Sequence, residues 1–180
     1  MRMKFVVAGV ACAALAVTGG VALAGSGDAP ETKAAPVAAT AAAAPKTLTL
    51  VRYFGGAQQK HWVTTAAAPG PLYRREGTFR ILAQPAGGTR ALYSCLNGYV
   101  LLDQFVSARS DCESPKSVAL GRVGYVYLKP PKGVKVKPLY RCSIVNGSRS
   151  EHFLSARSDC ERRPTSGKLV VEGRLGYTLV

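Results

Sequence analysis

Several motifs that carry enzyme chemistry are missing from this chain of 180 residues. It has no H-E-x-x-H zinc motif, no Gly-rich phosphate loop, no nucleophile elbow and no C-x-x-C pair. We therefore predict that the protein is not an enzyme and that it needs no cofactor and no metal ion. A Ser-His-Asp triad needs no sequence motif, because the fold alone brings its members together. A hydrolase is accordingly kept as a third hypothesis.

Acidic residues are also scarce. The chain has 10 Asp and Glu against 24 Lys and Arg, which gives a formal net charge of +14. Residues 47–180 hold 20 of the basic and 8 of the acidic residues, a charge of +12. An excess of this size favours anionic partners and speeds their encounter with the protein.

The chain lacks an apolar run of the length that crosses a membrane, which is about 20 residues. The apolar stretch 5–17 follows a short positively charged start and precedes an A-x-A site that ends at Ala24. This order is typical of a secretory signal peptide, which we place at 1–24. The protein is then secreted, extracellular or cell-wall associated, with no membrane span after processing. Cys12 leaves lipid attachment as an alternative.

Large apolar residues are nearly absent from 25–46, which is rich in Ala, Pro and Thr. Such a segment buries too little surface to offset its chain entropy, so we predict a disordered tether. Residues 47–180 remain, and their length suits one compact domain with its own core.

What the domain does have is an internal repeat. The phrase Ser-Ala-Arg-Ser-Asp-Cys-Glu occurs unchanged at 107–113 and at 155–161. A third copy lies upstream in a diverged form without cysteines, as is usual for a terminal repeat. We place the three units at about 48–90, 91–137 and 138–180.

The repeat also bears on the cysteines. Four cysteines remain after removal of the signal peptide, and an even number in a secreted chain indicates disulfides. Cys95 and Cys142 hold equivalent positions, as do Cys112 and Cys160. We therefore predict one disulfide within each unit, Cys95–Cys112 and Cys142–Cys160, and prefer this to a zinc site.

No long segment has helical periodicity, which indicates an all-β fold. Each unit holds four short runs rich in β-branched and aromatic residues, separated by Gly, Pro, Asn, Ser and Asp. Three units of four strands predict twelve strands with pseudo-threefold symmetry. We predict a β-trefoil-like fold, with a β-prism as the alternative and an open sandwich as the third choice.

The repeated unit resembles a family of secreted bacterial repeats of unknown function, over about residues 48–180. The third unit carries the resemblance best, with Leu-Tyr-Arg at 139–141, Glu-His-Phe at 151–153 and Glu-Gly at 172–173. The second unit departs from it, because Gln104 replaces the histidine. The resemblance implies an accessory or binding role rather than catalysis, and it identifies no ligand.

A polar residue followed by an aromatic one recurs at the same place in each unit. The candidate ligand-binding pairs are His61 with Trp62, Gln104 with Phe105 and His152 with Phe153. The aromatic ring would stack on a sugar while the polar group bonds hydroxyls; alternatively both are structural. Neighbouring residues of a strand face opposite sides, and we expect the polar one to point outward.

Two further candidates come from acidic and basic residues. Glu76 and Glu172 precede glycines in equivalent places, and we interpret them as turn or strand-end hydrogen-bonding groups rather than paired catalytic carboxylates. The segment 129–138 carries four lysines among prolines, and Lys132 and Lys135 are candidate contacts for an anionic polymer. The alternative is a solvated linker.

These observations predict a secreted binding module, monomeric, for cell-surface carbohydrate or an anionic polymer. The alternative is a protein-binding module such as a protease inhibitor, with 129–138 or 147–149 as its loop. We expect no nucleic-acid partner, because no motif for one is present.

Overall fold

The computed structural model describes residues 44–57, 59–98, 103–162 and 166–180. They belong to one compact unit that begins at Ala42. The predicted signal peptide, its cleavage site at Ala24, Cys12 and nearly all of the predicted tether lie outside the described residues.

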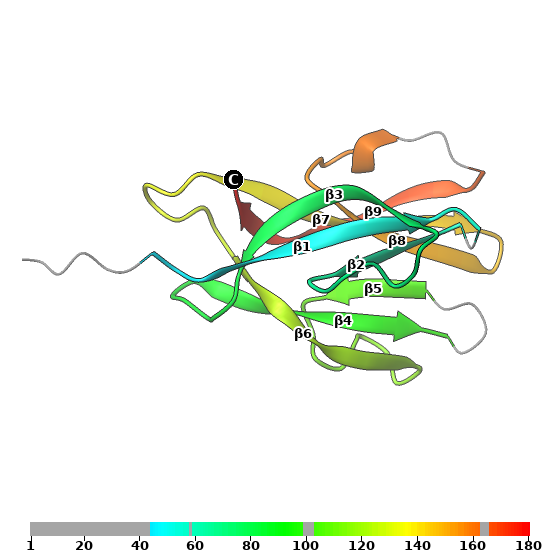
Figure 1. Cartoon of the computed structure of the whole chain (residues 1–180), viewed down its shortest axis with the longest axis horizontal. Helices are drawn as coiled ribbons and strands as arrows, with labels where there is room; N and C mark the ends of the chain where they lie inside the picture. The colour runs from blue at the N-terminus through cyan, green and yellow to red at the C-terminus, as the bar shows by residue number, and fades with distance from the viewer. Residues whose placement is uncertain (1–43, 58, 99–102, 163–165) are drawn as a thin grey trace, which may run out of the picture. The chain divides into compact units, whose positions relative to one another are not determined.

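The described part of the chain is all-β, as predicted, with nine antiparallel strands and one short 3-10 helix (Figure 1). Each sequence unit contributes three strands in succession. The strands are β1 (Thr47–Gly55), β2 (Lys60–Thr64), β3 (Tyr73–Leu82), β4 (Thr89–Asn97), β5 (Asp103–Ser107), β6 (Ser117–Tyr127), β7 (Val136–Asn146), β8 (Arg149–Ser155) and β9 (Lys168–Leu179), and the helix is η1 (Cys160–Arg162).

The first strand of each unit lies between the other two. The orders are β2-β1-β3, β5-β4-β6 and β8-β7-β9. Single bridges join the third strands of the units, at Leu82–Tyr125, Tyr127–Tyr177 and Arg80–Leu179. The result is one nine-stranded sheet that is not closed into a barrel.

The predicted count of four strands per unit is wrong for the described residues. The last two runs of each unit form one long strand, as in β6, which continues through Gly121. Gly121 has a φ of +130°, and the ladder between β6 and β4 shifts its register on either side of this residue. The strand therefore accommodates the glycine in a β-bulge instead of ending there, and these nine strands do not show a trefoil.

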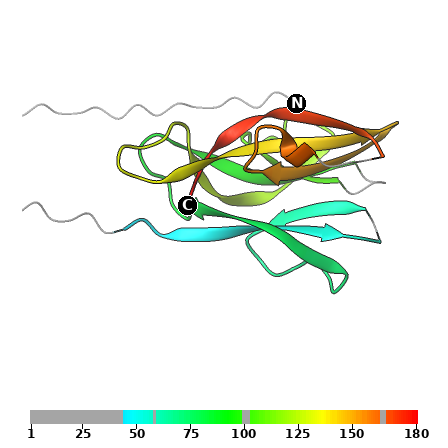
Figure 2. The same ribbon diagram turned by 90° about the horizontal axis from the view of Figure 1, so that it is seen from above.

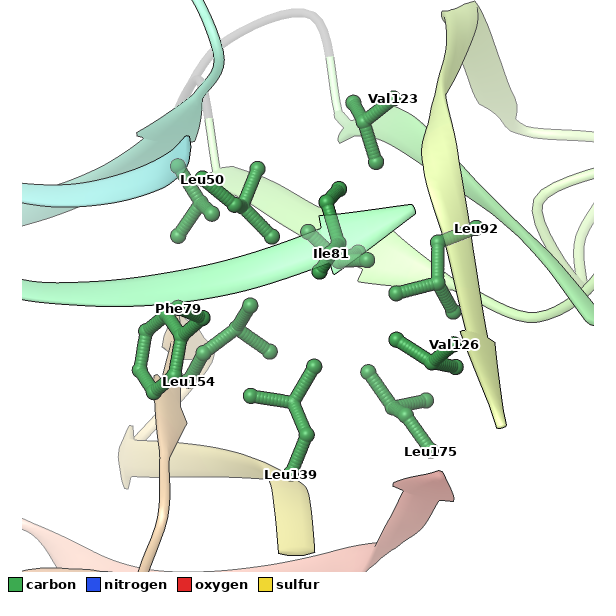
Figure 3. Close-up of a cluster of buried hydrophobic side chains, with 11 residues drawn as sticks. Leu50, Phe79, Ile81, Leu92, Val123, Val126, Leu139, Leu154 and Leu175 are labelled. Atoms are coloured by element: carbon green, nitrogen blue, oxygen red, sulfur yellow. The ribbon is translucent and has the colours of Figure 1, made fainter. Parts of the chain in front are cut away.

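The main core is built from equivalent side chains of the three units (Figure 3). Each first strand contributes a leucine that is fully buried, and burial of such a side chain stabilises the fold by roughly 2 kcal/mol. The second and third strands of each unit add one equivalent residue each, and β3 and β6 also add Ile81 and Val126. The three sets are Leu50, Leu92 and Leu139; Val63, Val106 and Leu154; and Phe79, Val123 and Leu175.

Both predicted disulfides are confirmed. Cys95 bonds Cys112 and Cys142 bonds Cys160, with Cα–Cα distances of 5.7 and 5.9 Å. The first disulfide packs with Phe105 and the second with Phe153. Two disulfides are consistent with an extracellular or otherwise oxidising location.

In the first unit Tyr53 stands where the other units have the first cysteine of the disulfide. Tyr53 lies opposite Trp62 in the ladder between β1 and β2. In the second unit the same two positions are Cys95 and Phe105. Trp62 takes the place of Phe105, so the first unit keeps an aromatic residue opposite this position but has no cysteine there.

Candidate functional site

The predicted ligand-binding side chains lie mostly between the units. His61 and Gln104 are buried, and so are Phe105 and Phe153. The expectation that the polar residue points outward is therefore wrong for His61 and Gln104. The reason is that β2, β5 and β8 lie against one another, so a side chain on the second face of these strands meets a neighbouring unit instead of water.

Trp62 and His152 are half-buried, whereas Lys132 and Lys135 are exposed. These four are thus the predicted binding residues that retain contact with solvent. They come from three different places, the strands β2 and β8 and the loop between β6 and β7.

A first ion-pair network joins the first unit to the third. His61 lies between two carboxylates, with Nδ1 bonded to Glu151 and Nε2 at 2.9 Å from Oε2 of Glu76. Nη1 of Arg52 donates to Oε1 of Glu161 at 2.7 Å. Arg52, His61 and Glu76 of the first unit thus meet Glu151 and Glu161 of the third.

A second network repeats this arrangement between the third and second units. Nδ1 of His152 bonds Oδ2 of Asp103 at 2.6 Å, and its Nε2 lies 3.0 Å from Glu172. Arg141 donates to both carboxylate oxygens of Glu113, at 2.7 and 2.8 Å, and also pairs with Glu172. All five residues hold the positions of their counterparts in the first network.

Both histidines are held in the charged form. Burial by itself lowers the pKa of His152, but the hydrogen bonds and charges of Asp103 and Glu172 outweigh it and raise that pKa to about 9. The pKa of His61 is also raised, because Glu151 and Glu76 outweigh the effect of burial. An imidazolium donates from both ring nitrogens, as each histidine does here. A general base needs a pKa near the working pH. Histidines whose pKa is raised in this way are therefore suited to act as cations in ion pairs and not as general bases.

The third junction, between the second and first units, has no ion pair among the described residues. Ser94, Gln104 and Leu120 hold the positions of the Arg, His and Glu, and Lys60 holds the position of the facing acid. The amide of Gln104 instead accepts from the backbone N–H of Val63 at 2.8 Å and donates to its carbonyl at 3.1 Å. The second unit thus lacks the Arg and the His of this junction, and the first unit has Lys60 where an acid would face them.

The repeated heptapeptide builds the loop that supplies the acid. The hydroxyl of Ser107 accepts from the N–H of Arg109 at 2.9 Å and donates to Glu113 at 2.5 Å. Asp111 accepts from the N–H of Glu113 and pairs with Arg109. Glu113 has a φ of +64°, and its carboxylate reaches Arg141. Ser107 and Asp111 thus fix the turn by accepting hydrogen bonds from the backbone two residues on.

The second copy of the heptapeptide makes equivalent bonds and directs Glu161 to Arg52. Sequence reasoning missed this role of Glu113 and Glu161. The sequence did contain a signal for it. The glutamate of the heptapeptide occurs in the second and third units, and the units that they contact, the third and the first, carry an arginine at the facing position.

Glu76 and Glu172 occupy bulges within β3 and β9, where the ladder skips one residue. Each bonds the histidine and lies near the arginine of its own unit. The predicted hydrogen-bonding role is confirmed, although the position is a bulge and not a turn. Burial raises the pKa of Glu172, but His152 outweighs it and lowers that pKa to about 2.

All eight acidic side chains of 47–180 are engaged in this way. Six belong to the two networks, and Asp111 and Asp159 pair with Arg109 and Arg157 of the two loops. Lysine takes part in none of the ion pairs found within the described residues.

At one end of the domain every charged side chain is basic. Here the chain enters β1 and passes between units, and backbone hydrogen bonds join Ala83 to Lys46, Leu128 to Gly88 and Val180 to Lys135, at 2.9, 2.8 and 3.2 Å. We call this the connection end. It comprises residues 44–49, 79–92, 123–139 and 175–180. These segments carry no acidic side chain and seven basic ones: Lys46, Arg80, Arg90, Lys129, Lys132, Lys135 and Lys137.

The loop 128–135 projects at the connection end, beside the start of β1 (Figures 1 and 2). It contains Lys129, Lys132 and Lys135, which are all exposed. Lys137 differs, because its ammonium lies 5.8 Å from the ring centre of Phe79.

Within the described ranges, no group of three or more His, Cys, Asp or Glu side chains is arranged to hold a metal ion. The same part of the chain has no helix with the length and apolarity to cross a membrane. Comparisons with protein-family models, with curated proteins and with solved structures found no match to this chain.

Proposed function

We propose that the protein is a secreted, non-enzymatic module that binds an anionic polymer at the cell surface through its connection end. The observation that carries this proposal is the use of every acidic side chain of the domain in internal ion pairs. The other lysines and arginines among the described residues form no ion pair, and those of the connection end lie together.

The chemistry of this end suits a polyanion. Exposed lysines are point charges on flexible stems, which adapt to many arrangements of anionic groups. A surface of one sign also attracts an oppositely charged polymer over about a Debye length, near 8 Å at physiological salt.

The proposal assigns binding to Lys132 and Lys135 and gives the His–aromatic positions a structural role. His61 and His152 each have both ring nitrogens bonded to carboxylates, so neither has a donor left for a sugar hydroxyl. Secretion rests on the predicted signal peptide, and the two disulfides support it.

The test is retention of the purified protein on cell-wall material, prepared with and without its anionic polymers, over a series of salt concentrations. We expect binding that needs the anionic polymer and weakens as salt rises. Lys132→Ala with Lys135→Ala should weaken it several-fold. The matched control is Arg149→Ala with Lys168→Ala, which removes two exposed charges outside the connection end.

Two results would contradict the proposal. Equal weakening by both variant pairs would show that net charge matters and the connection end does not. Salt-resistant binding to a defined neutral sugar, lost in Trp62→Ala, would point to a lectin-like site in the first unit.

A further inference from the structure

Apolar side chains stand among the lysines of the connection end. Leu128 and Val134 are 42 % and 40 % exposed, and Leu48 is 38 % exposed. Leu128 and Val134 belong to the same loop as Lys129, Lys132 and Lys135. An isolated exposed aliphatic side chain is ordinary, but a short loop that carries two of them between three lysines has mixed apolar and cationic character.

The backbone of this loop is held in place. The N–H of Leu128 donates to the carbonyl of Gly88 at 2.8 Å, and the carbonyl of Lys135 accepts from Val180 at 3.2 Å. Between these points the N–H of Val134 donates to the carbonyl of Pro131 at 3.3 Å, which closes a turn. The loop thus presents its apolar and charged side chains from a backbone fixed at both ends.

We infer that the connection end also binds the surface of an anionic phospholipid bilayer. This inference rests on the same basic side chains as the proposed function. The lysines would lie among the lipid phosphates, and Leu128 and Val134 would enter the boundary between headgroups and acyl chains. Such an interface stabilises apolar and basic side chains together. A hydrophilic polymer would use the lysines alone and leave the apolar side chains in water.

The direction of the chain agrees with this orientation. Lys46 leads into β1 at the connection end, with its carbonyl bonded to Ala83. The predicted tether therefore joins the domain at its basic end.

The experiment measures co-sedimentation of the purified protein with vesicles of phosphatidylcholine alone and with vesicles that also contain phosphatidylglycerol. Retention on a resin that carries polyphosphate is measured in parallel. We expect binding to the anionic vesicles only. Leu128→Ser with Val134→Ser should lower vesicle binding by roughly tenfold, because two partly buried aliphatic groups are lost, and should leave retention on polyphosphate unchanged.

Lys132→Ala with Lys135→Ala should weaken both kinds of binding, by roughly tenfold or more on vesicles. The matched apolar control is Val118→Ser with Leu120→Ser, at residues that are 43 % and 47 % exposed in the first half of β6. This control should change neither kind of binding.

A urea unfolding curve like that of the parent shows that the Leu128 and Val134 variant is folded. The inference is overturned if the protein binds polyphosphate but not anionic vesicles, or if that variant binds vesicles as the parent does; the proposed function then stands. Failure to bind either anion would contradict both.

Discussion

The guanidinium of Arg141 donates two hydrogen bonds to the carboxylate of Glu113, at 2.7 and 2.8 Å, and so joins the third repeat unit to the second. Arg52 holds the same position in the first unit and bonds Glu161 of the third. Two of the three junctions are therefore made by an arginine and a glutamate. The arginine comes from the first strand of a unit, and the glutamate comes from the heptapeptide loop of the neighbouring unit.

The Arg141–Glu113 pair should contribute measurably to stability. Arg141→Ala leaves Glu113 partly buried without its cation and leaves Glu172 with His152 alone. Removal of one partner of such a pair is destabilising. We expect the free energy of unfolding to fall by about 2 kcal/mol in urea titrations, after allowance for the partial exposure of both acids. Arg109→Ala is the control, because its pair with Asp111 is exposed and should matter little. An equal decrease in the free energy of unfolding in the two variants would mean that the pair at the junction stabilises the domain no more than an exposed pair does.

Stability should fall on the alkaline side of neutrality. The pKa of His152 is raised to about 9 in the folded protein, against about 6.5 in the unfolded chain. The stabilisation by charged His152 is thus complete below pH 6.5 and is lost as the pH rises through 9. We expect a decrease on the order of 2 kcal/mol over this window in denaturant titrations. His152→Gln, the residue that the second unit uses, should lower stability at pH 6 and remove most of this decrease.

Protonation of Glu172 should destabilise the folded domain at low pH. Its pKa is lowered to about 2 by His152, so the stabilisation is present above the unfolded value near 4.5 and is lost as the pH falls toward 2. Thermal unfolding measured at intervals from pH 6 to pH 2 should show a falling midpoint. Glu172→Gln should make that profile shallower, and a profile identical to the parent would contradict the assignment.

Gly124 should not tolerate a side chain. Its φ is +149°, and an added Cβ would lie 2.6 Å from Cδ1 of Ile81 and 2.8 Å from the carbonyl oxygen of Leu82. Gly124→Ala should therefore destabilise the domain by about 3 kcal/mol, from backbone strain and overpacking. Gly87→Ala is the matched control, because nothing lies within 4 Å of its added Cβ. Similar unfolding midpoints for the two variants would show that β3 yields easily at this contact.

Removal of one disulfide should be costly but local. Cys142→Ser with Cys160→Ser opens a loop of 18 residues, which by the chain-entropy estimate lowers stability by about 3 kcal/mol. It should also loosen the loop that directs Glu161 to Arg52. Hydrogen exchange should then rise in residues 155–162 more than in 107–113, and a uniform rise would contradict a local effect.

The tandem units account for what was predictable from sequence. Two identical heptapeptides showed the repeat, and the equivalence of Cys95 with Cys142 and of Cys112 with Cys160 gave the disulfide pairing. The strand count failed at residues such as Gly121, because a glycine that ends a strand and one that sits in a bulge have the same local signature. The alternation of side chains along a strand also placed His61 and Gln104 on the face opposite to the aromatic residues. It did not show that a neighbouring unit covers that face.

The sequence by itself determined the all-β class, the three units, both disulfides and the excess of basic residues, because these follow from local pattern, equivalence of positions and composition. The tertiary structure alone decided which side chains meet across units. Arg52 and Glu161 are 109 residues apart, and no local pattern encodes such a contact. The fold also brings the acidic side chains to the junctions, where the partly buried Arg and His side chains need charged partners. The lysines of the connection end are exposed to water and need no such partner.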